Sequence, residues 1–299
     1  MRVFVTGASG WIGSASIAEL LAAGHDVVGL ARNDDSAARI VAAGATPHRG
    51  GLDDLDSLRA GAEDADAVVH LAFKHDFSDF AGAGRTERAA IEAFHEVLAG
   101  SDRPFLFASG VAMVAPGRVA TEEDPSPFSG PEAPRGGAES LALSYAAEGM
   151  RPVSLRFAPT VHGAGGDHGF VAVIARAARQ AGAAPYVGDG SNRWAAVHRG
   201  DAGRLVALAV ERAPAGAVLH AVAEEGVPTR EIAAALAAAL GVPTASISPE
   251  EAGERIGMIG TFYGMDMAAS SARTRELLGW EPTGPTLAED IAAGHYPGN

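Results

Sequence analysis

A glycine-rich turn, TGASGWIG at residues 6–13, separates a short β-rich run from the first helical pattern of the chain. Gly7 permits a tight turn, Gly10 lets backbone amides approach a bound anion, and Gly13 lets the helix pack closely on the strand. The helix N-terminus adds a positive dipole and unpaired N–H groups. The spacing therefore predicts a turn that binds the pyrophosphate of a dinucleotide, the alternative being a glycine-rich turn without a ligand.

Short apolar runs alternate with helical patterns through the first half of the chain. The runs are nearly continuous in apolar residues, as expected for parallel strands that helices cover on both faces. This order predicts an α/β fold with a doubly wound parallel sheet. We expect strands at about 2–6, 26–31, 67–72, 104–109 and 152–157. We expect helices near 11–23, 34–43, 55–61, 82–99 and 136–149.

The second half of the chain has shorter helical patterns than the first half. A glycine-rich loop at 162–169 is followed by shorter helical patterns, and capping boxes at Ser248–Glu251 and Thr286–Glu289 mark two helix starts. We therefore expect a dinucleotide-binding domain at 1–160 and a smaller, helix-rich substrate lobe at 161–299. Residues 185–215 are expected to pack back on the first domain.

Composition excludes several classes of partner. The net charge of −14 disfavours nucleic acid, because phosphate backbones attract basic surfaces. No run of 18 apolar residues predicts a membrane span, and the first residues do not form a signal segment. The chain has no cysteine, which excludes thiolate chemistry and fits a reducing cytoplasm. We expect a cytoplasmic protein that acts on a small molecule, with no nucleic-acid or membrane partner.

The end of the second strand favours one form of the cofactor. An acid at this point binds the ribose hydroxyls of NAD, whereas an arginine accommodates the 2′-phosphate of NADP. Here Arg32 follows the strand, and Asp34 and Asp35 come later, where acids suit the start of a helix. The sequence therefore favours NADP(H) over NAD(H), with Ser9 and Arg32 as the phosphate contacts.

The Thr-Gly-x-x-Gly-x-x-Gly spacing resembles the short-chain dehydrogenase/reductase superfamily. The resemblance is to its extended and atypical branch, which includes NAD-dependent epimerase/dehydratase-like and 3β-hydroxysteroid dehydrogenase-like proteins. It implies a Rossmann fold and covers almost the whole chain. Further matching segments are VVHLA (68–72), FASGVAMV (107–114), LRFAPTVHG (155–163), VGDGSNRWAAVHRGDAGRL (187–205) and RTRELLGWEPT (273–283).

The same resemblance implies a set of cofactor contacts. The first turn holds the pyrophosphate, the fourth-strand segment passes under the cofactor, and the backbone after the sixth strand meets the nicotinamide carboxamide. The acid that often binds adenine is replaced by Gly51, which leaves the Leu52 backbone for that contact. The implied contacts are Gly7, Ser9, Gly10, Trp11, Ile12, Gly13, Arg32, Leu52, Leu71, Ala72, Phe73, Arg135 and Val161.

The main departure from the family lies in its catalytic dyad. Relatives carry Tyr-x-x-x-Lys after the fifth strand, with a glutamate four residues past the lysine, and the lysine lowers the tyrosine pKa. Taking Glu139 as that glutamate puts Arg135 at the lysine position and Pro131 at the tyrosine position. Lys74 is the only lysine in the chain, so no other register restores the dyad.

Other side chains must then handle the proton. The family's catalytic hydroxyl falls on Gly110, with Ser109 one residue away. Ser109, Lys74 and His75 are the candidate catalytic residues, because a hydroxyl, an ammonium group or an imidazole can bind or protonate a substrate oxygen. The alternatives are a strand end for Ser109, a solvated loop for Lys74 and His75, and a surface arginine at 135. The histidines lack metal-ligand spacing, so no metal site is expected.

Three residues are candidate substrate contacts. Arg193 and Trp194 lie where related nucleotide-sugar enzymes clamp a diphosphate, and the tryptophan suits a hydrophobic substrate better than a sugar diphosphate. His162 replaces the usual tyrosine of a Val-Tyr-Gly segment. The alternatives are a core position for Trp194 and a domain-junction position for His162.

Three functions follow in order of preference. The first is an NADP(H)-dependent oxidoreductase acting on a small, fairly apolar carbonyl or alcohol. The second is a non-catalytic NADP(H)-binding regulator or sensor, and the third is a nucleotide-sugar epimerase or dehydratase, which normally needs the missing tyrosine. In similar proteins paired helices form a homodimer, and the helices near 82–99 and 136–149 could pair in the same way, although no residue pattern in the sequence requires it.

Overall fold

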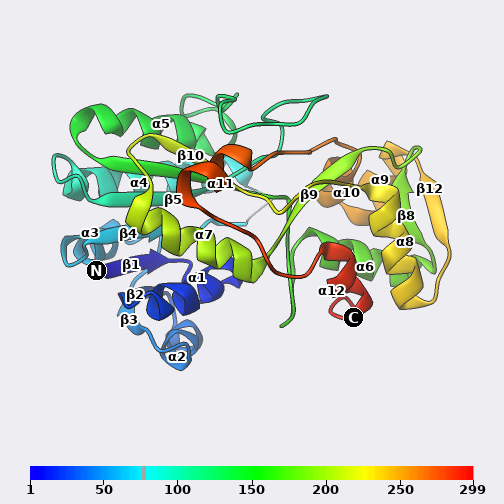
Figure 1. Ribbon diagram of the computed structural model, residues 1–299, viewed down its shortest axis with the longest axis horizontal. Coiled ribbons are helices and arrows are strands. Elements are labelled where there is room, and N and C mark those ends of the chain that lie inside the picture. Colours follow the sequence, from blue (N-terminus) through cyan, green and yellow to red (C-terminus); the bar gives the residue numbers. More distant parts are fainter. Residues whose placement is uncertain (76–78, 299) are drawn as a thin grey trace.

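The computed structural model describes residues 1–75 and 79–298 and confirms the expected α/β architecture (Figure 1). Within these residues, seven parallel strands form the main sheet in the order β10-β6-β5-β4-β1-β2-β3. The chain order reverses between β1 and β4, and a crevice for a ligand forms at such a point. The strands are β1 (Arg2–Thr6), β2 (Asp26–Ala31), β3 (Thr46–Arg49), β4 (Ala67–His70), β5 (Pro104–Gly110), β6 (Arg151–Phe157) and β10 (Ala217–Ala221).

Helices cover both faces of this sheet because successive residues of each strand point to opposite sides. On β1, Val3 and Val5 belong to one apolar cluster and Phe4 to another. The first cluster includes residues of α1 (Trp11–Ala22), α2 (Asp34–Ala42) and α7 (Arg199–Arg212). The second includes residues of α3 (Leu55–Glu63), α4 (Phe80–Leu98) and α5 (Ala138–Ser144).

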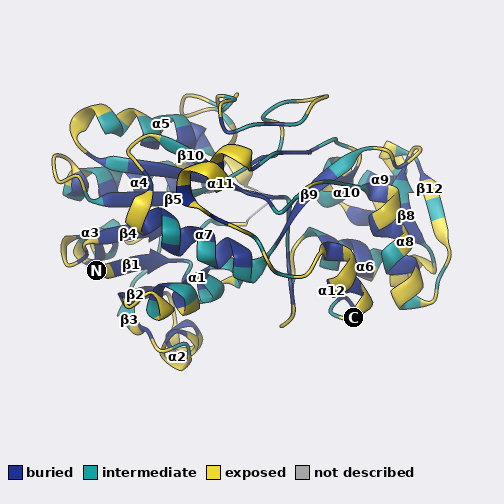
Figure 2. Ribbon diagram, in the orientation of Figure 1, coloured by how far each residue is buried: buried dark blue, intermediate teal, exposed yellow. Residues whose placement is uncertain are grey.

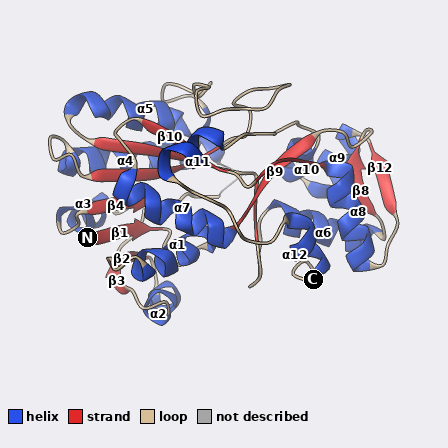
Figure 3. Ribbon diagram, viewed as in Figure 1, coloured by secondary structure: helices blue, strands red, loops and turns tan. Residues whose placement is uncertain are grey.

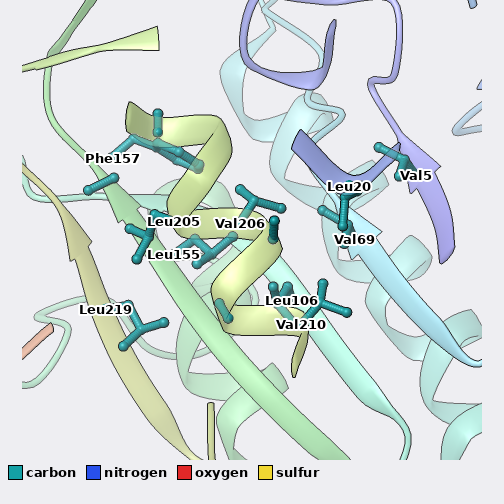
Figure 4. Packing of buried hydrophobic residues seen from close by; sticks show 14 of the residues in the cluster. Val5, Leu20, Val69, Leu106, Leu155, Phe157, Leu205, Val206, Val210 and Leu219 are labelled. Atoms are coloured by element: carbon teal, nitrogen blue, oxygen red, sulfur yellow. The ribbon is translucent and has the colours of Figure 1, made fainter. Parts of the chain in front are cut away.

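Helix α7 belongs to the main sheet although it comes late in the sequence. Figure 4 shows Leu205, Val206 and Val210 of α7 beside Leu155 of β6 and Leu106 of β5. The chain continues from α7 into β10, which pairs with β6 at the edge of the sheet. Helix α11 (Ala272–Leu278) then packs against β10. The first lobe is therefore completed by segments from the second half of the chain.

The second lobe lies to the right in Figure 3 and mixes short strands with helices. It contains two small sheets, and Figure 2 shows that β8 and β9 are largely buried whereas β12 at the edge of the lobe is largely exposed. One sheet contains β7 (Thr160–His162), β9 (Arg193–His198) and β11 (Glu224–Pro228), and the other β8 (Ala184–Val187) and β12 (Thr244–Ile247). The helices are α6 (Phe170–Ala181), α8 (Thr229–Leu240), α9 (Pro249–Ile256), α10 (Met258–Tyr263) and α12 (Leu287–Ala292).

The segment after β5 differs from the sequence-based expectation of a helix at 136–149. Helix α5 begins only at Ala138 and gives way after Ser144 to a 3₁₀ turn at Tyr145–Glu148. A second 3₁₀ turn, Pro134–Gly137, precedes α5, and its residues Arg135 and Gly136 have φ values of 55° and 62°. These left-handed conformations are incompatible with an α-helix, so the helix cannot extend further toward its N-terminus.

Two other features of the sequence analysis have a clear outcome. The capping boxes are confirmed: Ser248 and Thr286 accept hydrogen bonds from the backbone of Glu251 and Glu289, which bond back to the caps. In the part of the chain that the structure describes, no helix combines the length and the apolar character needed to cross a membrane.

Candidate functional site

The first turn has the geometry of a phosphate cradle. Gly7 has a φ of 67°, and a Cβ at this position would lie 2.8 Å from the Ala72 nitrogen. A Cβ at Gly13 would lie 2.0 Å from the Gly7 carbonyl oxygen. Ser9 and Ile12 are half-buried beside these glycines, and Leu71 and Ala72, which follow β4, form the wall against which Gly7 packs.

Helix α1 presents its first backbone N–H groups to this cradle. It begins at Trp11 with Gly10 as the N-cap residue. Among the described residues no side chain caps it, and no acidic residue lies in its first turn. By contrast, α2 and α3 are capped by the side chains of Asn33 and Asp54. Uncapped N–H groups at a helix N-terminus bind anions. The residues present therefore fit the pyrophosphate of a dinucleotide.

The Trp11 side chain joins the cradle to the second lobe. Its indole N–H donates to the Val161 carbonyl at 2.7 Å. Val161 belongs to the backbone segment that is expected to meet the nicotinamide. The guanidinium of Arg199 lies 4.1 Å from the Trp11 ring centre and donates to Ser14 at 2.7 Å. His168 meets the same ring edge-on at 6.3 Å. This cluster holds β7 and the loop after it against the N-terminus of α1.

The adenine end of the crevice carries several charges. Arg32 is exposed directly after β2, and Leu52 is half-exposed in the loop after β3. Lys74 donates to Asp53 at 2.5 Å, so it lies beside the predicted adenine contact. The acid that follows Leu52 thus holds the ammonium group toward the adenine end, and the catalytic role of Lys74 stays a prediction.

Arg135 is held in one orientation by three groups: the Glu87 carboxylate, the Ala108 carbonyl and the Phe73 ring. Its Nε donates to Glu87 at 2.9 Å, and its Nη2 donates to the second Glu87 oxygen and to the Ala108 carbonyl, the latter at 3.0 Å. The guanidinium carbon lies 4.6 Å from the centre of the Phe73 ring. Glu87 is only 3% exposed. Burial raises the pKa of Glu87, and the Arg135 charge opposes that shift. Nη1 donates to no described residue, so it is available to a ligand.

Ser109 faces away from the position of the family's hydroxyl. Its hydroxyl donates to Glu139 at 2.5 Å, and Glu139 accepts two further bonds from the buried Arg156 at 2.9 and 2.5 Å. A Cβ at Gly110 would meet only the Phe157 carbonyl, at 3.8 Å. Ser109 lines a small pocket of about 30 Å³ with Arg135. Because its hydrogen is bonded to Glu139, Ser109 can accept a hydrogen bond from a ligand but cannot donate one.

His75, the third catalytic candidate, is linked to Arg135 through the Phe73 ring, which both side chains contact. Its ring meets Phe73 edge-on at 5.3 Å. Partial burial lowers the pKa of His75, and the charges of Arg135 and His168 lower it further. The imidazole is therefore neutral near pH 7. The last two residues of the 73–77 segment lie outside the described residues.

The three candidate substrate contacts lie within the second lobe. Trp194 is fully buried, its N–H donates to the Met265 carbonyl at 3.2 Å, and its ring packs on Tyr263 at 5.2 Å. His162 is fully buried and pairs with Asp290 at 2.6 Å. This burial agrees with the alternatives of a core position for Trp194 and a domain-junction position for His162, and contact of either side chain with a substrate stays a prediction. Arg193 is half-exposed and bound to Asp266 at 2.8 Å.

A cavity of about 400 Å³ lies between β11, α8 and α12, on the second lobe, and is lined by residues such as Val227, Ile232 and Leu287. None of the predicted site residues lines it. Among the described residues, no group of three or more His, Cys, Asp or Glu side chains could hold a metal ion.

The sequence analysis missed Glu87, and its helix position carried a signal. On α4 the buried side chains Ala83, Ala90, Ile91 and Phe94 recur at spacings of three and four residues, and Glu87 falls on the same stripe. A glutamate on an apolar stripe needs a partner of opposite charge. No sequence spacing, however, pairs it with Arg135, which lies 48 residues further along the chain.

The sheet order and the first turn define the class of dinucleotide-binding α/β proteins. The family model described as the NAD dependent epimerase/dehydratase family matches residues 3–223, and the chain belongs to this family. The chain is 46% identical to the uncharacterised protein C2A9.02 of Schizosaccharomyces pombe over 297 residues, 99% of this chain and 100% of that protein. It is 42% identical to the uncharacterised protein YLL056C of Saccharomyces cerevisiae, again over 297 residues, 99% of each chain.

Solved structures with assigned ligands share this fold. MoeE5 in complex with UDP-glucuronic acid and NAD matches with a TM-score of 0.73 and 25% identity, over 98% of this chain and 97% of that one. DesIV, a dTDP-glucose 4,6-dehydratase from Streptomyces venezuelae, matches with a TM-score of 0.77 and 20% identity, over 98% and 96% of the two chains. The latter likeness shows the fold alone.

Restoring the missing dyad is expected to give no gain in rate. In relatives the tyrosine and lysine lie four residues apart on one helix, whereas here Arg135 lies in a left-handed turn before α5 begins. A tyrosine and a lysine introduced together by Pro131→Tyr and Arg135→Lys would not share a helical face. The measurement is NADPH consumption with a carbonyl panel, and a rate above that of the parent protein would contradict this expectation.

Proposed function

We propose that the protein is an NADP(H)-dependent oxidoreductase acting on a small, fairly apolar carbonyl or alcohol. The observation that carries the proposal is the phosphate cradle at the reversal of the strand order, with uncapped α1 amides and the exposed Arg32 beside it. Two similar proteins support the cofactor class and the reaction class separately. MoeE5 forms a complex with NAD, and a quinoline-oxide ketoreductase of Stigmatella aurantiaca is 31% identical over 166 residues, about half of each chain.

The bound cofactor would supply or accept the hydride, and this chain would supply orientation and the proton. The cradle would hold the pyrophosphate, and the free Nη1 donors of Arg135 would bind a ribose hydroxyl or the substrate oxygen. A guanidinium stays protonated and cannot act as the acid. His75, near Arg135, is the described side chain best suited to exchange a proton with the substrate oxygen.

The walls of the crevice support a small and fairly apolar substrate. The Phe73 ring lies 4.6 Å from the Arg135 guanidinium carbon, and Phe128 lines the small pocket that Arg135 and Ser109 share. Arg193, at the position where nucleotide-sugar enzymes clamp a diphosphate, is already bound to Asp266. A nucleotide-sugar substrate therefore ranks last among the three functions.

Replacing His75 with asparagine is expected to lower kcat by about 100-fold, because general acid–base catalysis contributes about 10²- to 10⁴-fold. The affinity for NADPH should stay unchanged, since the imidazole lies beyond the cradle. His95→Asn is the matched control: this half-buried imidazole of α4 stacks on Tyr145 at 3.6 Å. Steady-state NADPH consumption measures both, and an unchanged kcat in H75N would remove His75 from the mechanism.

The pH dependence of the rate provides a second test of His75. Burial and the nearby charges lower its pKa below the ordinary value of about 6.5. Alcohol oxidation needs the neutral imidazole as proton acceptor, so its rate should fall at a lower pH than an ordinary imidazole would give. Carbonyl reduction needs the protonated form and should rise over the same acidic range. H75N should lose both trends.

The second candidate function is a cofactor-binding sensor without chemistry. It is favoured by the loss of the dyad, by the open space at Gly110 and by the pairing of Lys74 with Asp53. The two functions differ in one observable. A sensor binds NADPH and transfers no hydride to any member of a broad carbonyl panel, whereas the oxidoreductase consumes NADPH above the rate without substrate.

A further inference from the structure

An exposed ion pair lies at the carboxyl ends of β2 and β3, where the 2′-phosphate of NADP would bind. In the sheet register Arg49 pairs with Ala31, the residue that precedes Arg32. The Arg49 guanidinium donates to Asp34 at 2.5 Å. The side chains of Arg49 and Asp34 are 58% and 96% exposed. Both charges are therefore within reach of a ligand that contacts Arg32.

Asp34 is not needed to start helix α2. The cap is Asn33, whose side chain accepts from the Ser36 backbone while the Ser36 hydroxyl bonds back to the Asn33 backbone. Asp34 is the first residue of the helix, and its side chain makes no hydrogen bond in that capping box. An exposed ion pair of this kind also contributes little to folding. The Arg49–Asp34 pair is thus free to respond to a ligand.

An unpaired carboxylate at this point has opposite effects on the two cofactors. It accepts a hydrogen bond from the ribose 2′-hydroxyl of NAD, and it repels the 2′-phosphate of NADP. Arg49 removes this conflict while it is bound to Asp34, and its remaining N–H donors can bind phosphate oxygens.

We infer that Arg49 is a specificity-determining residue: it neutralises Asp34 and binds the 2′-phosphate together with Arg32. The inference rests on the proposed NADP(H) function and goes beyond it by naming the pair that sets the choice. Loss of Arg49 removes one positive charge and exposes one negative charge. The affinity for NADPH should therefore fall while the affinity for NADH stays level or rises.

The test measures dissociation constants of the full chain for NADPH and NADH by cofactor fluorescence, and for 2′,5′-ADP and 5′-AMP by calorimetry. Arg49→Ala is expected to weaken NADPH and 2′,5′-ADP by about 20-fold, in the range of a lost charged hydrogen bond. Binding of NADH and 5′-AMP should not weaken. Asp34→Ala in the Arg49→Ala background should restore several-fold of the lost NADPH affinity, because it removes the exposed carboxylate.

The matched control is the exposed Arg2–Asp26 pair, whose charged atoms are 3.7 Å apart. This pair lies at the amino ends of β1 and β2, away from their carboxyl ends. Arg2→Ala should leave the affinities for NADPH and NADH unchanged. An unchanged NADPH/NADH affinity ratio in R49A, or no recovery in the double variant, would overturn the inference. A parent protein that binds NADH better than NADPH would instead contradict the cofactor choice in the proposed function. Circular dichroism of each variant verifies the fold. No loss of fold is expected, because the Arg49 and Asp34 side chains are exposed.

Discussion

Replacing Arg135 with alanine is expected to destabilise the protein by about 3–5 kcal/mol, the typical cost of leaving one partner of a buried ion pair alone. Glu87 is 3% exposed, and Arg135 is its ion-pair partner. Urea denaturation at pH 7 measures the loss. The control is Arg255→Ala, which breaks an exposed pair with Glu251 and should cost at most about 0.5 kcal/mol. Equal losses in the two variants would contradict a buried role for the pair.

The pH dependence of this loss has a defined sign. Burial already raises the pKa of Glu87, and removal of the Arg135 charge raises it further. The carboxyl group is then protonated more easily in the folded state than in the unfolded state. The loss of unfolding free energy in R135A should therefore be largest above neutral pH and should decrease as the pH falls. A second variant that also carries Glu87→Leu should recover much of the stability, since no unpaired charge remains.

Replacing Gly13 with alanine is expected to weaken NADPH binding by at least about 20-fold, the effect of losing about one charged hydrogen bond between the cradle and the pyrophosphate. The new Cβ would lie 2.0 Å from the Gly7 oxygen and 3.0 Å from the Ala8 Cα, so the cradle backbone must move. Gly253→Ala is the control, because its Cβ would meet only the Thr261 hydroxyl, at 3.8 Å. Fluorescence titration compares the two, and equal affinities would contradict the assignment of the cradle.

The fold was accessible from the sequence where the strands are apolar. The runs at 2–6 and 26–31 coincide with β1 and β2, because both are buried between two helical layers. Strand β3, TPHR, was missed because none of its four residues is fully buried and it lacks an apolar run. Strand β10 was missed because nothing local indicates that residues 217–221 return to the first sheet.

The sequence predicted the geometry of the candidate site correctly only where the backbone conformation determines the arrangement. Glycine spacing specifies a close turn, and the structure places Gly7 and Gly13 in backbone contact with their neighbours. The role of a side chain depends on its tertiary partner, which the sequence does not give. Lys74 binds Asp53, and Trp194 lies in the second core. The helical dyad register was likewise misleading, because the Arg135 backbone is left-handed.

Stereospecific deuteride transfer tests the central claim most directly. The parent protein is incubated with NADPH carrying deuterium at C4 of the nicotinamide and with a panel of small apolar ketones and aldehydes. The account predicts an alcohol product with deuterium on the carbinol carbon, and an about 100-fold slower transfer in H75N. Tight NADPH binding without deuterium in any product would contradict the oxidoreductase function and favour the sensor.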